Sequence, residues 1–334
     1  MLHRCMRTMF KSACSFRKLS FTKKFRLIDI SVNEAGLFGY SLVLKNFYQT
    51  LSAAEQQIRP RPKYVIDFNK FSKKMTSYCT SGQQSAGETA AHGILLDDDI
   101  IFRQLFEHKS FTYTYLIGDR ETAECVLIDP VLETVDRDLK IIEQLGLNLI
   151  YGVNTHCHAD HITGTGHIKS KRPNVKSIIS KYSGAKADIL FNDNDFIEFG
   201  RHKIQCISTP GHTDGCTTFV WKEKCVAFTG DTLLIKGCGR TDFQAGDPGL
   251  LHDSVHGKIF SLPDHFILFP AHDYTGQTMT TVSEEKKFNP RLTLAREDFI
   301  GVMNGLNLPY PKQIDAALPA NLVCGIQKSP GQLV

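Results

Sequence analysis

The sequence predicts a layered α/β protein, on the basis of three observations. Of its 334 residues, 42% are hydrophobic and 22% are charged, which is typical of a globular chain with its own core. Apolar segments of strand length recur from residue 111 onward, together with a short amphipathic helix. Four of these segments run directly into loops that carry His or Asp. Layered α/β proteins bind ligands beyond the carboxyl ends of their strands, so these loops also predict where the site lies.

The first 26 residues differ in composition from the rest of the chain. They contain eight Lys or Arg, three Ser and no acid, and apolar residues recur among the bases at roughly helical spacing. This pattern predicts a mitochondrial presequence, and therefore a location in the mitochondrial matrix. A solvated tail, or an N-terminus produced by a misplaced start codon, would also explain it.

Residues 27–100 are predicted to be an N-terminal extension and linker with little order. Within them, residues 72–93 are rich in Ser, Thr, Gly and Gln and lack apolar periodicity. After this linker the pattern of strands begins, and the folded domain is predicted to occupy residues 101–334.

The composition excludes several classes of protein. The net charge of the whole chain is +4, but beyond residue 26 there are 31 bases against 35 acids, which argues against a nucleic-acid-binding body. There is no run of about 18 apolar residues, so we expect no membrane-spanning helix. The ten cysteines follow no paired spacing, and free thiols in a reducing compartment are expected.

The domain begins with two predicted strands and a helix. Residues 111–119 alternate apolar and polar side chains, and residues 123–131 form an apolar run stopped by Asp-Pro, so both segments are expected to be strands. Residues 136–146 have apolar residues at helical spacing, acids at the start and a Gly at the end. They predict a short amphipathic helix.

Four further strands each end in a loop with metal-binding residue types. They cover residues 147–153, 202–208, 224–229 and 265–269, and the loops that follow read "NTHCHADH", "TPGHTDG", "GDTLL" and "PAHDY". If the four strand ends meet at one sheet edge, they gather seven donors, namely His156, His158, Asp160, His161, His212, Asp231 and His272.

A metal site explains both the number and the types of these residues. Neutral imidazoles and carboxylates suit iron, zinc, manganese or copper. Histidines satisfied by core hydrogen bonds would account for one or two of the five, but not for all. Cys157 lies between two of the histidines, yet a nucleophilic triad uses only one His.

Together these motifs resemble the metallo-β-lactamase superfamily over roughly residues 103–326. The resemblance implies a four-layered αββα sandwich with the metal at the sheet edge. Four further segments are similar to the persulfide dioxygenase family, in the glyoxalase II-like branch: "LIDPVLETVDRD" (127–138), "GCGRTDFQ" (237–244), "NPRLTL" (289–294) and "LPANLVCGI" (318–326). Residues 27–100 match nothing known in that family.

The family resemblance implies one Fe(II) per chain, held by His156, His212 and Asp231. The other donors would surround the metal and orient its ligands; they are His158, Asp160, His161 and His272. The implied reaction is the oxidation of glutathione persulfide with O2 to sulfite and glutathione, in mitochondrial sulfide catabolism. No organic cofactor is implied, because iron carries the redox chemistry.

Spacing alone leaves a second function open. A binuclear metal hydrolase of glutathione thioesters would use all seven donors, with Asp231 bridging two ions. The partners implied by the resemblance are glutathione persulfide and O2. The sequence does not give the oligomeric state, and a homodimer is allowed for.

Arg240 and Tyr274 are the candidate catalytic residues outside the metal donors. Arg240 would either bind a substrate carboxylate through a two-pronged hydrogen bond or form a structural salt bridge to Asp242 or Asp273. Tyr274 would donate its phenol to bound oxygen or to the substrate. Two cysteines would either meet the persulfide directly or serve as buried structural thiols, namely Cys238 and Cys324.

Overall fold

The computed structural model describes residues 98–325 of the chain. The predicted presequence at residues 1–26 and nearly all of the predicted extension at residues 27–100 lie outside the described residues. The first described strand begins at Ile100, next to the predicted start of the catalytic domain.

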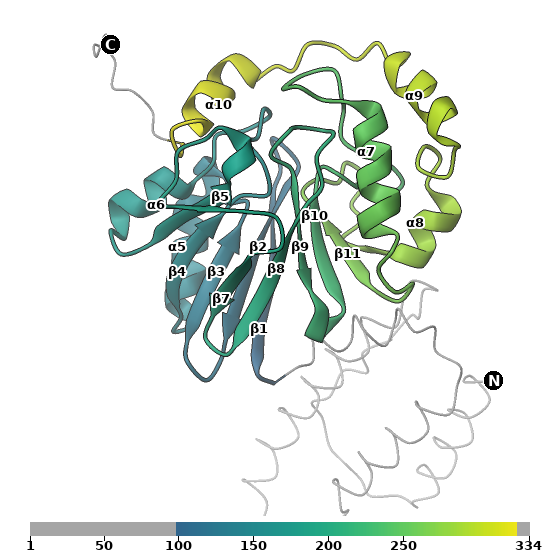
Figure 1. The fold of residues 1–334 in the computed structure, drawn as a ribbon. Helices are drawn as coiled ribbons and strands as arrows, with labels where there is room; N and C mark the ends of the chain where they lie inside the picture. Colours follow the sequence, from purple (N-terminus) through teal and green to yellow (C-terminus); the bar gives the residue numbers. More distant parts are fainter. Residues whose placement is uncertain (1–97, 326–334) are drawn as a thin grey trace, which may run out of the picture. The chain divides into compact units, whose positions relative to one another are not determined.

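Two six-stranded sheets form the centre of this part of the chain (Figure 1). The first has the spatial order β1-β2-β3-β4-β5-β6, with antiparallel pairing from β1 to β3 and parallel pairing from β3 to β6. Its strands are β1 (Ile100–Glu107), β2 (Thr112–Asp119), β3 (Glu124–Ile128), β4 (Asn148–Val153), β5 (Lys176–Ser180) and β6 (Ile189–Phe191).

The second sheet has the order β12-β11-β10-β9-β8-β7 and is antiparallel except for the pair β10 and β11. Its strands are β7 (Phe196–Phe199), β8 (His202–Ser208), β9 (Thr217–Trp221), β10 (Val226–Gly230), β11 (Ile267–Pro270) and β12 (Thr280–Thr281).

The two sheets pack face to face through large apolar side chains. Tyr115 and Ile117 are two residues apart on β2, so they lie on the same face of the sheet, and both are in the cluster between the sheets. In that cluster they join Phe219, Phe228 and Phe269 of the second sheet, and the ring centroids of Tyr115 and Phe228 are 4.9 Å apart. This shared core holds the strand ends of the two sheets in a defined relation.

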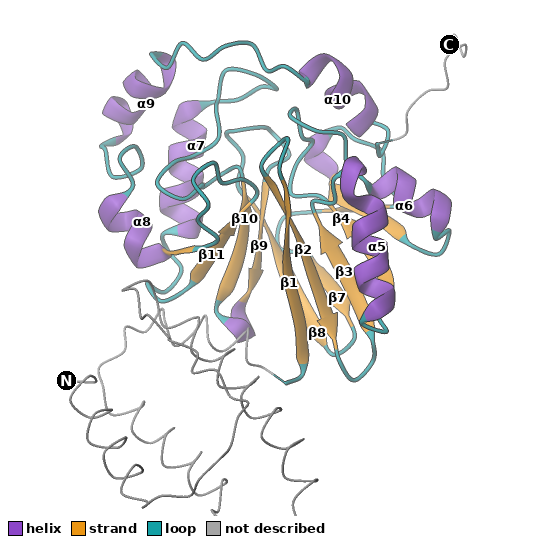
Figure 2. Cartoon of the chain, turned by 180° about the vertical axis from the view of Figure 1, so that it is seen from behind, coloured by secondary structure: helices purple, strands orange, loops and turns teal. Residues whose placement is uncertain are grey.

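Helices cover both outer faces, as Figures 1 and 2 show. On the first sheet, Leu139 and Ile168 pack into a second core with Leu116 and Leu127. On the second sheet, Phe299 and Leu251 pack into a third core. The layers are therefore helix, sheet, sheet and helix, and the predicted αββα sandwich is confirmed.

The helices on the first sheet are α5 (Val135–Gln144) and α6 (Thr165–Lys171), and those on the second are α7 (Pro248–Ser254), α8 (Val282–Phe288) and α9 (Arg296–Asn304). The segment after α9 crosses the end of the sheets to α10 (Ile314–Asn321) (Figure 2). Short 3-10 helices cover Leu132–Thr134, Lys181–Ser183 and Lys222–Lys224, and one π-helical turn covers Val255–Ile259. Within residues 98–325, no helix combines the length and the hydropathy needed to cross a membrane.

One predicted strand is shorter than its pattern indicates. The apolar run over residues 123–131 gives a strand that ends at Ile128. Asp129 has a φ of +50°, in the left-handed region, so the extended backbone cannot continue through it. The turn points the Asp129 carboxylate at the loop that follows β4, where it bonds Thr155.

Candidate metal centre

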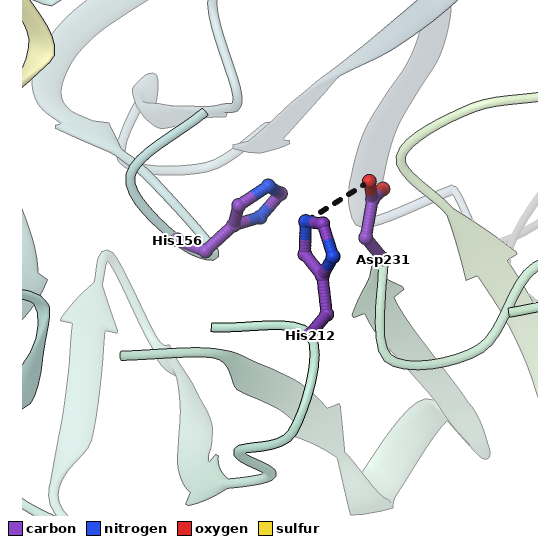
Figure 3. A group of neighbouring side chains, drawn as sticks. All are labelled: His156, His212 and Asp231. Carbon is purple, nitrogen blue, oxygen red and sulfur yellow. Dashed lines mark ion pairs between the residues drawn. The ribbon is translucent and has the colours of Figure 1, made fainter. Parts of the chain in front are cut away.

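The predicted loops meet at one edge of the sandwich. His156 follows β4 of the first sheet, whereas His212 and Asp231 follow β8 and β10 of the second. Figure 3 shows these three side chains gathered around one point. Their candidate ligand atoms all lie within 4.8 Å of one another, and His156 is only 1% exposed. The distances suit three donors to a single ion.

A second group of donors adjoins the first. It consists of His158, Asp160 and His272, whose candidate ligand atoms also lie within 4.8 Å of one another. His272 Nε2 is 3.5 Å from Asp231 Oδ1 and joins the two groups. His161 is in neither group, and its Nδ1 lies 3.0 Å from Asp160 Oδ2. The structure thus brings six predicted donors together in two groups and places the seventh beside them.

A hydrogen bond to one ring nitrogen of His212 determines which of its nitrogens faces the first group. His212 Nδ1 lies 2.6 Å from the carbonyl oxygen of Arg240, and a carbonyl only accepts. His212 therefore carries its hydrogen on Nδ1 and presents Nε2, which is 3.5 Å from Asp231 Oδ2. Two buried atoms in the group have no hydrogen-bond partner, His156 Nε2 and Asp231 Oδ1. A metal ion bound by these atoms would explain why they have none.

Asp129 is a site residue that the sequence analysis missed. Its Oδ1 accepts hydrogen bonds from Thr155 N at 2.7 Å and His158 Nε2 at 3.0 Å, and its Oδ2 accepts one from Thr155 Oγ1 at 2.9 Å. Thr155 Oγ1 in turn lies 3.0 Å from His156 Nδ1. The hydroxyl donates to the carboxylate, so its oxygen accepts from His156 Nδ1–H and leaves Nε2 unprotonated. Asp129 also follows a strand end, which is the signal that identified the other donors.

Asn321 of α10 is a second residue that the sequence analysis did not assign to the site. Its Nδ2 donates to the backbone carbonyls of His158 and His161, each at 2.8 Å. Its Oδ1 accepts from the backbone N of Thr163 at 2.9 Å. A single buried amide thus holds the backbone of the loop that carries four of the donors. It lies in the segment "LPANLVCGI", but nothing local in that segment indicates the contact.

The electrostatics favour neutral imidazoles at His156 and His158 and an ionised carboxylate at Asp231. Burial and neighbouring imidazoles lower the pKa values of His156 and His158 well below their usual value. Burial acts to raise the pKa of Asp231, but the surrounding histidines, His272 first, outweigh it and hold that pKa below its usual value. Metal binding requires these protonation states, since the ligands must offer free lone pairs.

Arg240 contacts His212 through its backbone carbonyl, and Tyr274 contacts His272 through its ring. The Arg240 guanidinium forms a two-pronged ion pair with Asp242, with both N–O distances at 2.6 Å, and donates to the carbonyl oxygen of Pro309 at 2.9 Å. The salt bridge considered for Arg240 is therefore present, and its role toward substrate stays a prediction. The Tyr274 ring lies 6.2 Å from that of His272 and almost parallel to it, at 12°.

The cysteines of interest are largely buried thiols. Burial raises the pKa of Cys157 to about 12, so this thiol is not ionised at neutral pH and makes a poor nucleophile. Cys238 is 5% exposed, with its Sγ 3.8 Å from Met303 Sδ, and burial raises its pKa to about 11. Burial also raises the pKa of Cys324, which is partly buried. These environments favour structural roles.

Comparisons with known proteins agree with the geometry. Residues 109–272 match the model of the metallo-beta-lactamase superfamily. The mouse protein "Persulfide dioxygenase ETHE1, mitochondrial" is 58% identical over 231 residues, which cover 69% of this chain and 91% of the mouse protein. The human protein of the same name is 58% identical over 228 residues, or 68% of this chain and 90% of the human protein.

Two solved structures are also similar to this chain. The crystal structure of ETHE1 from Myxococcus xanthus is 48% identical, with a TM-score of 0.66, and the match covers 68% of this chain and 100% of that chain. A metallo-beta-lactamase from Staphylococcus aureus, at 22% identity and a TM-score of 0.64, shares the fold. The chain therefore belongs to the persulfide dioxygenase family within the metallo-β-lactamase superfamily.

Proposed function

We propose that this persulfide dioxygenase holds one Fe(II) per chain and oxidises glutathione persulfide with O2 to sulfite and glutathione. The activity is that of the family, supported by 58% identity over 91% of the mouse enzyme. The observation that carries the proposal of an iron site is the group of His156, His212 and Asp231. Two imidazoles and one carboxylate, with other positions open, are the ligand type of non-haem Fe(II) oxygenases.

Iron, when bound, would supply the redox chemistry with O2 that amino-acid side chains cannot provide. The chain's own residues prepare its ligands. The Arg240 carbonyl and the Thr155 hydroxyl hold the rings of His212 and His156 with Nε2 inward. Burial keeps the His156 imidazole neutral, since the pKa of that group lies well below its usual value.

We assign the second group to orientation rather than to direct metal binding. It consists of His158, Asp160 and His272, with His161 beside it. His158 Nε2 donates to Asp129, which also bonds the backbone before His156. His272 Nε2 lies 3.5 Å from Asp231 Oδ1 and steadies that carboxylate. Such outer groups orient metal ligands and tune the metal.

Arg240 and Tyr274 are proposed to serve the substrate. Arg240 carries a planar, two-pronged donor that matches a carboxylate, and glutathione has two carboxylates. Its present pairing with Asp242 keeps the guanidinium in one orientation. Tyr274 is 65% exposed beside His272, so its phenol is open to a bound molecule.

The activity is tested by measuring O2 uptake and sulfite release by the iron-loaded protein with glutathione persulfide. The same preparation is assayed for hydrolysis of a glutathione thioester. We expect O2 uptake that requires the persulfide, and no thioester hydrolysis. Hydrolysis without O2 uptake would instead support the binuclear hydrolase, which spacing alone leaves open.

The number of metal ions is tested with His156→Ala and His161→Ala. His156→Ala removes one of three protein donors, so iron and O2 uptake should both be lost. Loss of a group outside the ligands costs ~10–100-fold in affinity or activity, so His161→Ala should keep its iron at saturating metal. Metal per chain is measured by elemental analysis. Equal metal loss in the two variants would contradict the three-ligand iron site.

We also propose that residues 1–26 direct the chain to the mitochondrial matrix. The mouse and human relatives are named as mitochondrial proteins, which supports this assignment. Deleting residues 1–26 should abolish delivery to mitochondria in cells without changing activity in vitro; an unchanged location would contradict the proposal.

A chain that starts at Leu96 should fold and retain activity if residues 101–334 form the catalytic domain. The homodimer stays a prediction, checked by light scattering.

A further inference from the structure

Three exposed aromatic side chains form a continuous surface beside the second donor group. This surface, the aromatic wall, consists of Phe106, Phe111 and Tyr274. The ring centroid of Phe111 lies 5.4 Å from that of Tyr274 and 6.2 Å from that of Phe106. Phe106 and Phe111 are each 40% exposed, and Tyr274 is 65% exposed. Because Tyr274 also stacks on His272, the wall runs from solvent to the second donor group.

Phe111 has a backbone conformation that is unfavourable for a bulky residue. Its φ is +58°, in the left-handed region that bulky residues rarely adopt and that Gly adopts freely. Such strain persists where the surroundings hold the residue in place, and it is common at functional sites. The Phe111 carbonyl accepts from the backbone N of Asp273 at 3.4 Å, a bond that Gly would also make. The backbone contact therefore does not require a phenyl ring here.

Side-chain hydrogen bonds hold the turn that carries Tyr274. Asp273 Oδ2 accepts hydrogen bonds from the backbone N of Thr275 at 2.8 Å and of Gln277 at 2.7 Å. These bonds hold the backbone that follows Tyr274 against the side chain of the residue before it. Rigid aromatic side chains provide a large contact area at a small entropic cost, which makes them effective in binding.

We infer that Phe111 is a specificity-determining residue whose ring, together with that of Tyr274, contacts the thiol carrier of an organic persulfide. This inference rests on the proposed function. The terminal sulfur must reach the metal group, so the carrier lies outside it, where the aromatic wall is exposed. Methylenes and amide planes of a peptide carrier can pack on aromatic rings. An inorganic persulfide has no carrier, so its binding should not depend on the aromatic wall.

The test compares Phe111→Gly with wild type in the full-length, iron-loaded protein. We expect KM for glutathione persulfide to rise about 3- to 10-fold, the loss that one aromatic contact represents. The kcat and the iron content should not change, and the melting temperature should not fall, because Gly relieves the strain. KM for inorganic hydrogen disulfide should be the same in both proteins. Phe111→Trp should restore KM for glutathione persulfide.

Ala123→Gly is the matched control. Ala123 has a φ of +60° and precedes β3, at the opposite end of that strand from Asp129. The control removes the same kind of strain away from the site, so it should change neither KM. A Phe111→Gly variant with wild-type KM for glutathione persulfide would overturn the inference. An equal rise for both substrates would overturn it too, since that result indicates general damage to the site.

Binding of glutathione, which is the carrier alone, tests the wall without turnover. Its dissociation constant, measured by calorimetric titration, should rise about 3- to 10-fold in Phe111→Gly. An unchanged constant would overturn the inference, whether or not the enzyme turns over. Failure of wild type to take up O2 with glutathione persulfide would contradict the proposed function alone. The two failures are thereby distinguished.

Discussion

Replacing Asp129 with Asn should weaken metal binding through the tautomer of His156. In the wild type, Asp129 Oδ2 accepts from the Thr155 hydroxyl, whose oxygen accepts from His156 Nδ1–H. An Asn that keeps its oxygen on Thr155 N and His158 turns its NH2 group toward the hydroxyl. The hydroxyl then accepts from Asn and donates to His156 Nδ1. The histidine hydrogen moves to Nε2, the atom that has no protein partner and faces the metal group.

The size of the effect follows from the number of bonds involved. Loss of a group that orients a metal ligand costs ~10–100-fold in affinity, or about 1.4–2.7 kcal/mol at 1.36 kcal/mol per tenfold. Asp129 makes three hydrogen bonds while 1% exposed; Asn keeps two of them as an acceptor and reverses the third, so all three are still made. A hydrogen bond to a charged group is worth about 1 kcal/mol more than one between neutral groups, so the free energy of unfolding of the metal-free protein should change by no more than about that amount.

Iron affinity is measured by competition with a chelator, and stability by urea unfolding of the metal-free protein. The matched variant is Thr155→Val, which removes the hydroxyl that connects Asp129 to His156. If the effect passes through that hydroxyl, the double variant should lose no more iron affinity than Thr155→Val alone. Additive losses would refute the reasoning. So would an Asp129→Asn protein that binds iron with wild-type affinity and is merely less stable.

Three other expectations concern Arg240, Cys157 and Asp188. Arg240→Lys should raise KM more than it lowers kcat, because Lys lacks the two-pronged donor. Asp242→Asn, which frees the guanidinium, should leave KM unchanged or lower. If both variants have normal kinetics and only lower melting temperatures, the salt bridge is structural. Cys157, with a pKa of about 12, should resist alkylation in the folded protein at neutral pH, and mass spectrometry that finds it modified would contradict its buried state. The pKa of Asp188 is lowered from 3.8 to about 2, and the largest cause is its hydrogen bond from Lys169. The ionised Asp188 therefore stabilises the fold above pH 4, and this stabilisation is lost as the pH falls from 4 to 2. The difference in unfolding free energy between wild type and Asp188→Asn should shrink over that range, and a constant difference would contradict the assignment.

Much of the fold was predictable from local patterns. The strands over residues 111–119, 147–153 and 202–208 have apolar patterns that a strand buries, and they correspond to β2, β4 and β8. The helix predicted over residues 136–146 corresponds to α5. Shorter strands such as β6, with three residues, and β12, with two, are too short for a pattern. They are strands because neighbouring strands pair with them.

The sequence by itself determined which residue types gather at the site. A His or Asp directly after an apolar strand is visible in the chain, and six of the seven donors found this way form the two groups. The sequence did not determine how the donors divide between the groups. That division depends on where the core between the sheets places His156 of the first sheet against His212 and Asp231 of the second.

Only the tertiary structure decided how each donor is held. The tautomer of His212 depends on a carbonyl 28 residues away, and that of His156 depends on Asp129, 27 residues before it in the chain, through Thr155. Asn321 holds the backbone at His158, His161 and Thr163 from more than 150 residues away in the chain. Hydrophobic periodicity is a local property that the chain displays before it folds. Hydrogen bonds between distant segments exist only after the sheets pack, because packing brings donor and acceptor within 3 Å and excludes the water that would otherwise bond them.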